Sequence, residues 1–324
     1  MLDVQNLSVD FRVDSGWIRS VNGVSFSLAP KASLGIVGES GSGKSVTALS
    51  ILRLHAQRTT RMSGAIRFDG DDLLRLPERR LREMRGRDIA MIFQDPMHSL
   101  NPVLTIGDQI GETLRIHQGL DVAAATRQAV DLLDMVRIPD AARRIADFPH
   151  QLSGGMRQRV MIAMAIACRP RLLIADEPTT ALDVTVQAQI LDLLRDLRED
   201  IGMAVILISH DLGLVAEFAE RVLVMYAGEL VEDAPARTIF ESPAHPYSEG
   251  LLRAIPSPDE DVHRLYAIPG RIPDPGNRPP GCNFAPRCEL AQPACRASEP
   301  ALEDVAPGHL VRCPVKLAAM EAAR

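Results

Sequence analysis

The sequence predicts an α/β fold in which short buried strands alternate with helices around a phosphate-binding loop. Three observations support this prediction. The apolar run from Leu34 to Val37 reads as a buried strand, and a glycine-rich loop follows it directly. A second apolar run, from Leu172 to Ala175, ends in two carboxylates. Buried strands with polar groups at their carboxyl ends are typical of parallel sheets that bind ligands at that edge.

Composition limits the class of protein further. With 324 residues, 46% of them hydrophobic, the chain can bury a large core and carry an extension beside it. The longest apolar runs, such as Ala204 to Ile208, are far too short to cross a bilayer. The first residues show no basic segment followed by an apolar stretch and a cleavage site. We therefore expect a protein that is cytosolic or peripheral on a membrane. The net charge of -6 argues against broad attraction to nucleic acid.

The N-terminal region alternates apolar and polar side chains over Leu2 to Phe11 and again over Val21 to Leu28. This period of two predicts a pair of strands. The turn-rich loop between them carries Trp17, the only tryptophan. Phe11 or Trp17 could stack on an adenine ring, since aromatic faces bind bases in this way. The alternative is that Phe11 only fills the core of a sheet.

The central motif is the run Gly-Glu-Ser-Gly-Ser-Gly-Lys-Ser from Gly38 to Ser45, followed by the helical run Val46 to Leu54. Glycines let several backbone N–H groups converge on one anion at the start of a helix. Lys44 adds a positive charge for the terminal phosphates, and the Ser45 hydroxyl is a natural ligand for nucleotide-bound Mg²⁺. The run predicts a nucleotide site.

The next region holds a predicted strand, Ala65 to Phe68, closed by an Asp-Gly turn. A charged helix is then expected over Asp71 to Arg85, broken or started near Pro77. The apolar run Ile89 to Phe93 predicts a buried strand that ends at Gln94. A glutamine at that edge could reach the metal or the attacking water of a phosphate site.

Residues 105–168 look predominantly helical and fall between two strands of the expected sheet, so they form an inserted helical subdomain. The expected helices span Ile106 to His117, Ala123 to Val136 and Gln158 to Ala167. Ser153, Gly154 and Gly155 precede the last of them. A serine and exposed N–H groups at a helix N-terminus form a second anion site.

The strand from Leu172 ends at Asp176 and Glu177. Asp176 can hold Mg²⁺ through a water, and Glu177 can polarise an attacking water as a general base. The alternative is a pair of surface acids at a strand end. Asp183 lies in the next loop, before a helix over Val186 to Arg198.

The buried strand Ala204 to Ile208 follows that helix and ends near His210. We expect His210 at the same sheet edge as Lys44 and Glu177, where it could hydrogen-bond a γ-phosphate.

These motifs, in this order and spacing, resemble those of ABC-transporter ATPase subunits. The resemblance covers residues 1–240, and its most diagnostic element is Leu-Ser-Gly-Gly at Leu152 to Gly155. It implies a P-loop NTPase core with an N-terminal antiparallel β-subdomain and an inserted helical subdomain over about residues 97–168. It also implies that two subunits close head to tail around two ATP molecules, and that the region Met97 to Val103 receives the membrane partners.

The resemblance assigns roles residue by residue. Phe11 is favoured over Trp17 for adenine stacking. The residues expected to bind the chain's own ATP are Phe11, Gly38, Glu39, Ser40, Gly41, Ser42, Gly43, Lys44, Ser45, Val46, Gln94 and Asp176. Those expected to hold Mg²⁺ are Ser45, Gln94 and Asp176, and those expected in hydrolysis are Glu177, His210 and Gln94. Ser153, Gly154 and Gly155 would serve the partner's ATP, with Asp183 at the dimer seam.

The remaining chain, residues 241–324, predicts an irregular C-terminal extension because prolines are dense over residues 255–314. Phe240 to Ser248 and Gly281 to Cys288 resemble segments of oligopeptide and dipeptide importer ATPases. The resemblance implies an ATPase that energises peptide import, peripheral on the cytoplasmic face of the inner membrane. Its implied partners are a second, homologous ATPase, two transmembrane permeases and an extracytoplasmic peptide-binding protein, with no nucleic acid.

Three alternatives to this function remain open. The cargo could be nickel or another small solute, since this subunit does not touch it. The chain could also be a soluble ABC ATPase acting on nucleic acid or ribosomes. A regulatory partner that binds nucleotide without hydrolysing it is the third alternative.

Four cysteines, Cys282, Cys288, Cys295 and Cys313, have the spacing C-x5-C-x6-C-x17-C in a segment with few apolar residues. Four thiolates suit a tetrahedral zinc or an iron–sulfur cluster, but the spacing matches neither common pattern. The resemblance favours a [4Fe-4S] cluster, with zinc or no metal as alternatives. Cys168 lies in a helical apolar run and reads as a small core residue.

Overall fold

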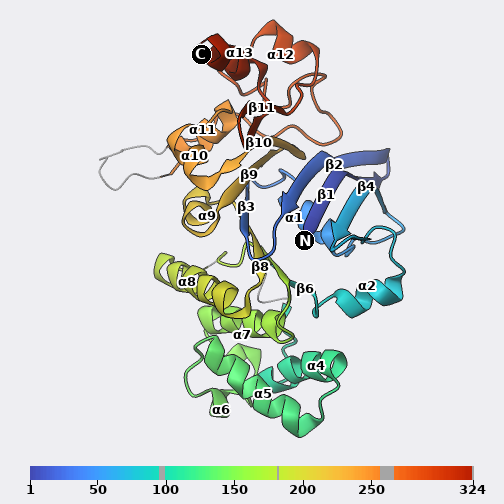
Figure 1. The fold of residues 1–324 in the computed structure, drawn as a ribbon, viewed down its shortest axis with the longest axis vertical. Coiled ribbons are helices and arrows are strands. Elements are labelled where there is room, and N and C mark those ends of the chain that lie inside the picture. The colour runs from blue at the N-terminus through green and yellow to red at the C-terminus, as the bar shows by residue number, and fades with distance from the viewer. Residues whose placement is uncertain (95–98, 181, 256–265, 323–324) are drawn as a thin grey trace. The chain divides into compact units, whose positions relative to one another are not determined.

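The computed structural model describes residues 1–94, 99–180, 182–255 and 266–322 (Figure 1). Its residues group into two compact units. The first unit comprises Met1–Leu28, Ser33–Arg75 and Leu207–Arg324, and the second comprises Ala29–Ala32 and Leu76–Ile206. The predicted division into residues 1–240 and 241–324 remains a prediction.

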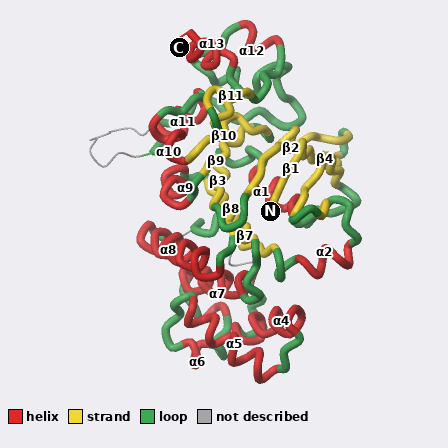
Figure 2. The backbone as a smooth tube through the Cα atoms, viewed as in Figure 1, coloured by secondary structure: helices red, strands yellow, loops and turns green. Residues whose placement is uncertain are grey.

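The first unit opens with an antiparallel sheet, as the alternating N-terminal sequence predicts. Its strands are β1 (Leu2–Val13), β2 (Gly16–Leu28), β4 (Thr60–Phe68) and β5 (Asp71–Asp72). They follow the order β2-β1-β4-β5, and β1, β2 and β4 lie side by side in Figure 2. The Trp17 segment, expected as a loop, instead belongs to β2 because it pairs with the end of β1.

A bulge explains the irregular pattern of β1. Its apolar residues change phase between Val4 and Leu7, yet both side chains are buried. The register with β2 shifts between these two residues, and Asn6 adopts the left-handed region at φ 49°. Its backbone N–H donates to Ser25 Oγ at 2.8 Å. The extra residue restores the alternation, so one face of the strand stays apolar.

The phosphate loop of the first unit connects β3 (Ser33–Val37), which is buried throughout, to α1 (Lys44–Ile51). Within this unit, strand hydrogen bonding gives the order β11-β12-β10-β9-β3, with β3 and β9 parallel. The remaining strands of this unit are β9 (Arg221–Tyr226), β10 (Glu229–Pro235), β11 (Glu303–Ala306) and β12 (His309–Val311). Strand β8 (Ala204–Ser209) is divided between the two units. The helices are α9 (Leu212–Phe218), α10 (Ala236–Glu241), α11 (Pro246–Arg253), α12 (Pro293–Ala297) and α13 (Pro314–Ala322).

The C-terminal extension is more regular than its proline content predicts. Among its described residues, β12 pairs antiparallel with β10, with Glu232 opposite Val311. Strand β11 then pairs with β12. Prolines keep these elements short, but hydrogen bonding to an existing strand is enough to order them.

A buried carboxylate joins the extension to β10. Glu232 is fully buried and accepts hydrogen bonds from the backbone N–H groups of Ala244 and His245, at 2.6 and 2.9 Å. His309 Nε2 lies 2.8 Å from the same carboxylate. Burial alone raises the pKa of Glu232, but these hydrogen bonds outweigh it and the pKa is lowered. The carboxylate therefore stays charged inside the unit.

The second unit holds the inserted helices. Its elements are α2 (Glu78–Met84), β6 (Ile89–Ile92), α4 (Ile106–Gln118), α5 (Val122–Met135), α6 (Ala141–Arg144), the short 3-10 helix η1 (Pro149–Gln151), α7 (Gly154–Ile166), β7 (Leu172–Asp176) and α8 (Val184–Ile201). Strands β6 and β7 pair in parallel. Figure 1 shows α4, α5 and α6 gathered beside α7.

The charged segment Asp71 to Arg85 is helical only after Pro77, the residue near which the helix was expected to break or start. Asp71 and Asp72 pair with β4, and Pro77 is the N-cap at which α2 begins. A proline fixes its own φ and has no N–H to donate, so it suits the start of a helix and not its interior.

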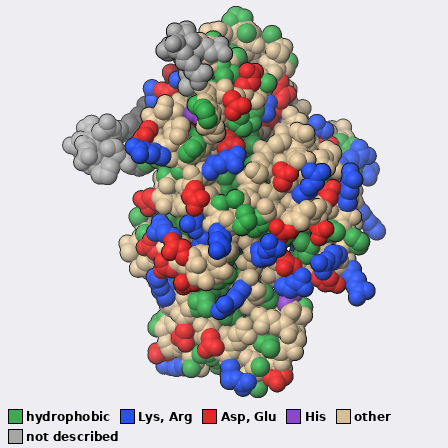
Figure 3. Space-filling view, viewed as in Figure 1, with side chains coloured by type: hydrophobic (Ala, Val, Ile, Leu, Met, Phe, Trp, Pro, Cys, Tyr) green, Lys and Arg blue, Asp and Glu red, His purple; other side chains and the backbone are tan. Residues whose placement is uncertain are grey.

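The surface in Figure 3 intersperses Lys and Arg with Asp and Glu side chains. Among the residues that the structure describes, no helix combines the length and apolar character needed to span a membrane.

The buried carboxylate yields a stability prediction. Glu232→Ala leaves two buried N–H groups and His309 without their acceptor, so we expect the free energy of unfolding to fall by about 3 kcal/mol. Glu241→Ala is the matched control, because Glu241 is exposed and forms its ion pair with the exposed Arg237. Its expected effect is within about 0.5 kcal/mol. Urea denaturation of both variants gives the comparison, and equal losses would contradict the assigned role of Glu232.

Candidate functional site

The loop from Gly38 to Lys44 adopts a backbone that its glycines permit. Gly41 and Gly43 have φ values of 83° and 100°, in the left-handed region. Gly38 has φ 152°, and a Cβ built there would lie 2.2 Å from the carbonyl oxygen of Met225. A side chain at Gly38 would therefore force β9 away from the loop.

Lys44 folds back over this loop. Its Nζ donates to the carbonyl oxygens of Gly38, at 2.7 Å, and Glu39, at 3.0 Å, and the residue is only 4% exposed. The buried Ser42 Oγ has no hydrogen-bond partner among the described residues. An orphaned hydroxyl, a fixed ammonium and a helix N-terminus beside them fit the phosphates of a nucleotide.

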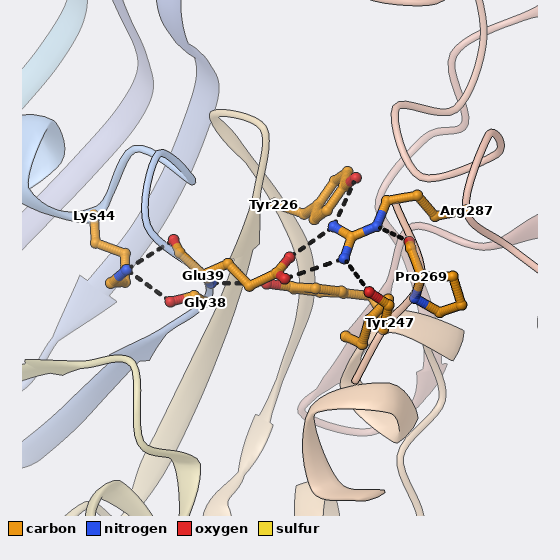
Figure 4. A network of polar contacts seen from close by, with 8 residues as sticks. Gly38, Glu39, Lys44, Tyr226, Tyr247, Pro269 and Arg287 are labelled. Atoms are coloured by element: carbon orange, nitrogen blue, oxygen red, sulfur yellow. Dashed lines mark hydrogen bonds and ion pairs between the residues drawn. The ribbon is translucent and has the colours of Figure 1, made fainter. Parts of the chain in front are cut away.

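Two residues of the extension contact the same loop, and sequence reasoning missed both. The Glu39 N–H donates to the hydroxyl of Tyr247 at 2.8 Å. The Glu39 carboxylate accepts from both terminal nitrogens of Arg287, at 2.7 and 3.1 Å, as Figure 4 shows. No local pattern could have found these contacts, because 208 and 248 residues separate the partners.

The second unit brings Gln94 and Glu177 together. Gln94 Nε2 donates to Glu177 Oε2 at 3.0 Å. The Thr180 hydroxyl, absent from the predicted set, donates to the same oxygen, also at 3.0 Å. Glu177 lies just beyond β7, with a strained left-handed φ of 48°. This left-handed backbone orients the side chain of Glu177 relative to the buried Asp176.

The predicted second anion site lies at the start of α7. Ser153 is its N-cap and accepts from the N–H of Met156 at 3.3 Å. A Cβ on Gly155 would come within 2.9 Å of Val186, so glycine also allows α7 to pack against α8. Asp183 caps α8 by accepting from the Val186 N–H at 3.0 Å. Both polar side chains thus have structural tasks besides the predicted ones.

Several predicted relationships connect the two units. Lys44, Ser45 and His210 belong to the first unit, whereas Asp176 and Glu177 belong to the second. Their expected meeting at one sheet edge, and the Mg²⁺ site it would form, remain predictions. Of the expected membrane-partner region Met97 to Val103, residues 97 and 98 lie outside the described residues.

The two aromatic candidates lie on neighbouring strands. The Phe11 ring makes an edge contact with His55, at 5.2 Å between centroids. The exposed Trp17 ring lies under the guanidinium of Arg61, 3.8 Å from its centroid. The stacking role expected of Phe11 remains a prediction.

The four extension cysteines line one cavity, together with His245 and apolar side chains that include Phe284. All four, and Cys168, are free thiols. Burial raises the pKa of Cys282 to about 11 and also raises the pKa of Cys288 and Cys313, so unliganded thiols there stay protonated. Within the described parts of the chain, no three His, Cys, Asp or Glu side chains are arranged to hold a metal ion.

Comparison with family models gives two matches along the chain. The ABC transporter model matches residues 21–180, which contain the phosphate loop, Gln94, the Ser153 segment and Glu177. The model for the C-terminal region of oligopeptide/dipeptide transporters matches residues 231–295.

Two relatives extend the similarity over nearly the whole chain, and a solved structure matches about three quarters of it. A Brucella abortus (strain 2308) protein, described as a candidate peptide import ATP-binding protein, is 62% identical over 98% of this chain and 95% of its own. The dipeptide transport ATP-binding protein DppD of Escherichia coli (strain K12) is 52% identical over 97% of this chain and 96% of its own. An ATP-binding cassette solved as a post-hydrolysis dimer with ADP and phosphate is 28% identical, with a TM-score of 0.66 over 73% of this chain and 99% of its own. The chain therefore belongs to the ATP-binding proteins of ABC transporters, in the branch that carries the oligopeptide/dipeptide transporter C-terminal region.

Proposed function

We propose that this chain is the ATP-hydrolysing subunit of a peptide importer. The observation that carries the proposal is the presence, in one chain, of an ABC transporter match and an oligopeptide/dipeptide transporter C-terminal region. Relatives at 62% and 52% identity are described as acting in peptide import and dipeptide transport. The phosphate loop, with Lys44 turned onto it, supports nucleotide binding by this chain.

Hydrolysis on this proposal follows the logic of phosphoryl transfer. Loop N–H groups and Lys44 would hold and neutralise the phosphates. Ser45, Gln94 and Asp176 would hold Mg²⁺, which would neutralise charge on the phosphate oxygens. Glu177 orients the attacking water as the general base, and its hydrogen bonds from Gln94 and Thr180 fix the carboxylate. His210 contacts the γ-phosphate.

The assembly we propose contains two ATPase subunits. Ser153, Gly154 and Gly155 close over the ATP of the partner, with Asp183 at the seam and Phe11 against the adenine. A related cassette was solved as a dimer with ADP and phosphate, which supports an assembly of two ATPase subunits. The second ATPase is a homologous chain, and the pair docks on two transmembrane permeases that receive peptide from an extracytoplasmic binding protein. This chain then lies peripherally on the cytoplasmic face of the inner membrane.

We also propose that the extension carries a [4Fe-4S] cluster. The support is a single apolar cavity lined by Cys282, Cys288, Cys295 and Cys313. Four thiolates are the usual ligands of a [4Fe-4S] cluster, and binding of the cluster would offset the cost of deprotonating buried thiols. When bound, the cluster would supply an iron–sulfur centre that cross-links four positions of the extension.

The cargo can be tested with the assembled transporter. We expect this chain to co-purify with two multi-span membrane proteins, and its ATPase activity in vesicles to rise several-fold with a peptide-loaded binding protein. A binding protein loaded with Ni²⁺ is the control. Stimulation by Ni²⁺ and not by peptide would replace the proposed cargo, and activity on ribosomes without membrane partners would overturn the transport function.

The general base can be tested by Glu177→Gln. The amide keeps the shape and the contact with Gln94 but cannot take a proton, so we expect nucleotide binding to persist while turnover falls at least about 100-fold. Glu199→Gln, at an exposed position in α8, is the matched control and should hydrolyse ATP at the parent rate. Parent-rate hydrolysis by the Glu177 variant would show that another group is the base.

The cluster prediction is tested by anaerobic purification of the full chain. We expect broad visible absorbance, with iron and acid-labile sulfide at about four per chain, and loss of both in Cys288→Ala. Cys168→Ala is the matched control, because Cys168 does not line the cavity and should not change the iron content. Stoichiometric zinc without iron would support the zinc alternative, and a metal-free chain would exclude both.

A further inference from the structure

We propose that Arg287 of the C-terminal extension, assisted by Tyr247, is a positioning residue that holds the phosphate loop in its nucleotide-binding shape by clamping Glu39. The proposal rests on the nucleotide-binding function given above and assigns part of it to the extension.

The guanidinium of Arg287 is fixed before it reaches the loop. Its Nε donates to the carbonyl oxygen of Pro269 at 2.7 Å, and Nη2 donates to that of Ile268 at 3.1 Å. The side chain is only 3% exposed. Two backbone carbonyls thus orient the planar fork so that Nη1 and Nη2 each donate to the carboxylate of Glu39 (Figure 4). Such a bidentate pair defines both distance and direction. Nη1 also donates to the hydroxyl of Tyr226 at 3.3 Å.

The charge of Arg287 is secure in this site. Burial alone lowers its pKa, but hydrogen bonds to Glu39 and Tyr226 raise it above the ordinary value. The guanidinium therefore remains protonated at every pH at which the protein is folded.

Tyr247 holds the backbone of the same loop residue. Its hydroxyl accepts from the Glu39 N–H, and its ring packs against Tyr226 and Phe284, at 4.7 and 5.4 Å between centroids. Burial raises the pKa of Tyr247, so the phenol stays neutral. The aromatic packing leaves the ring little freedom, which makes the hydroxyl a fixed acceptor.

Glu39 connects these contacts to Lys44. Its carbonyl accepts from Lys44 Nζ, its N–H donates to Tyr247, and its carboxylate pairs with Arg287. A loop whose backbone and side chain are already held by such contacts loses less conformational entropy when a nucleotide binds than a free loop does. Releasing the Arg287 clamp should therefore weaken nucleotide binding, although Arg287 need not touch the nucleotide.

A positioning role and simple electrostatics predict opposite changes in nucleotide affinity for one variant. Glu39→Gln removes a negative charge from the phosphate loop, so electrostatics alone predicts tighter binding of the anionic nucleotide. Loss of the clamp predicts weaker binding. Arg287→Lys keeps the positive charge and loses the bidentate geometry, so only a positioning role makes it harmful.

The experiment measures the Kd of the full chain for Mg-ATP by competition with a fluorescent ATP analogue. The variants are Glu39→Gln, Arg287→Lys and the double variant. Arg221→Lys is the matched control, because Arg221 makes an equivalent bidentate pair with Asp233 and its other side-chain bond goes to Ser27, not to the phosphate loop.

We expect each single clamp variant to raise the Kd about tenfold. The double variant should be no worse than either single, because both remove one interaction. Arg221→Lys should bind as the parent does. Parent-like binding by Arg287→Lys, tighter binding by Glu39→Gln, or additive effects in the double variant would each overturn the proposal. A parent chain that fails to bind Mg-ATP would instead overturn the proposed function.

A second measurement covers the case in which the Arg287 variant does not fold. Tyr247→Phe keeps the buried ring and removes only the acceptor of the Glu39 N–H. We expect amide hydrogen exchange at Glu39 to quicken at least about tenfold, while amides of α11 outside the Tyr247 turn keep the parent rate. Unchanged exchange at Glu39 would show that the extension does not hold the loop.

Discussion

The phosphate loop depends on interactions that reach it from the end of the chain. A glycine-rich backbone is permissive by nature, since glycine resists neither left-handed nor extended conformations. In this chain three hydrogen-bonding contacts of Glu39 define the loop. Lys44 donates to its carbonyl, Arg287 donates to its carboxylate, and its N–H donates to the Tyr247 hydroxyl. The cassette and its extension therefore share one polar network.

The extension is bound to the cassette by buried charge as well as by the loop contacts. Strand β10 carries Glu229 and Glu232 at buried positions. Glu229 accepts from Asn283 at 2.9 Å, and Glu232 is surrounded by donors from Ala244, His245 and His309. A carboxylate in the interior needs such donors, because burying it unpaired is costly. The buried carboxylates of β10 thus depend on donors from the residues that follow this strand.

The sequence allowed the α/β fold, the antiparallel N-terminal sheet and the family to be predicted, because these follow from local periodicity and from motifs with fixed spacing. The approach of Gln94 to Glu177 could be expected for the same reason, since both end neighbouring parallel strands. In the sequence, the bulge at Asn6 is visible only as a shift in the alternation of apolar and polar residues along β1. Local patterns do not show that Asp71 pairs with a strand or that Glu177 has a positive φ, because tertiary contacts decide both.

The contacts of Arg287 and Tyr247 with Glu39 could not be predicted from local sequence patterns, for a different reason. Its partners follow it by more than 200 residues, and a single arginine or tyrosine in a proline-rich segment carries no periodic signal. The same separation has a consequence during synthesis of the protein. The ribosome adds Arg287 248 residues after Glu39. The phosphate loop of the nascent chain therefore lacks its contact with Arg287 until that residue has left the ribosome.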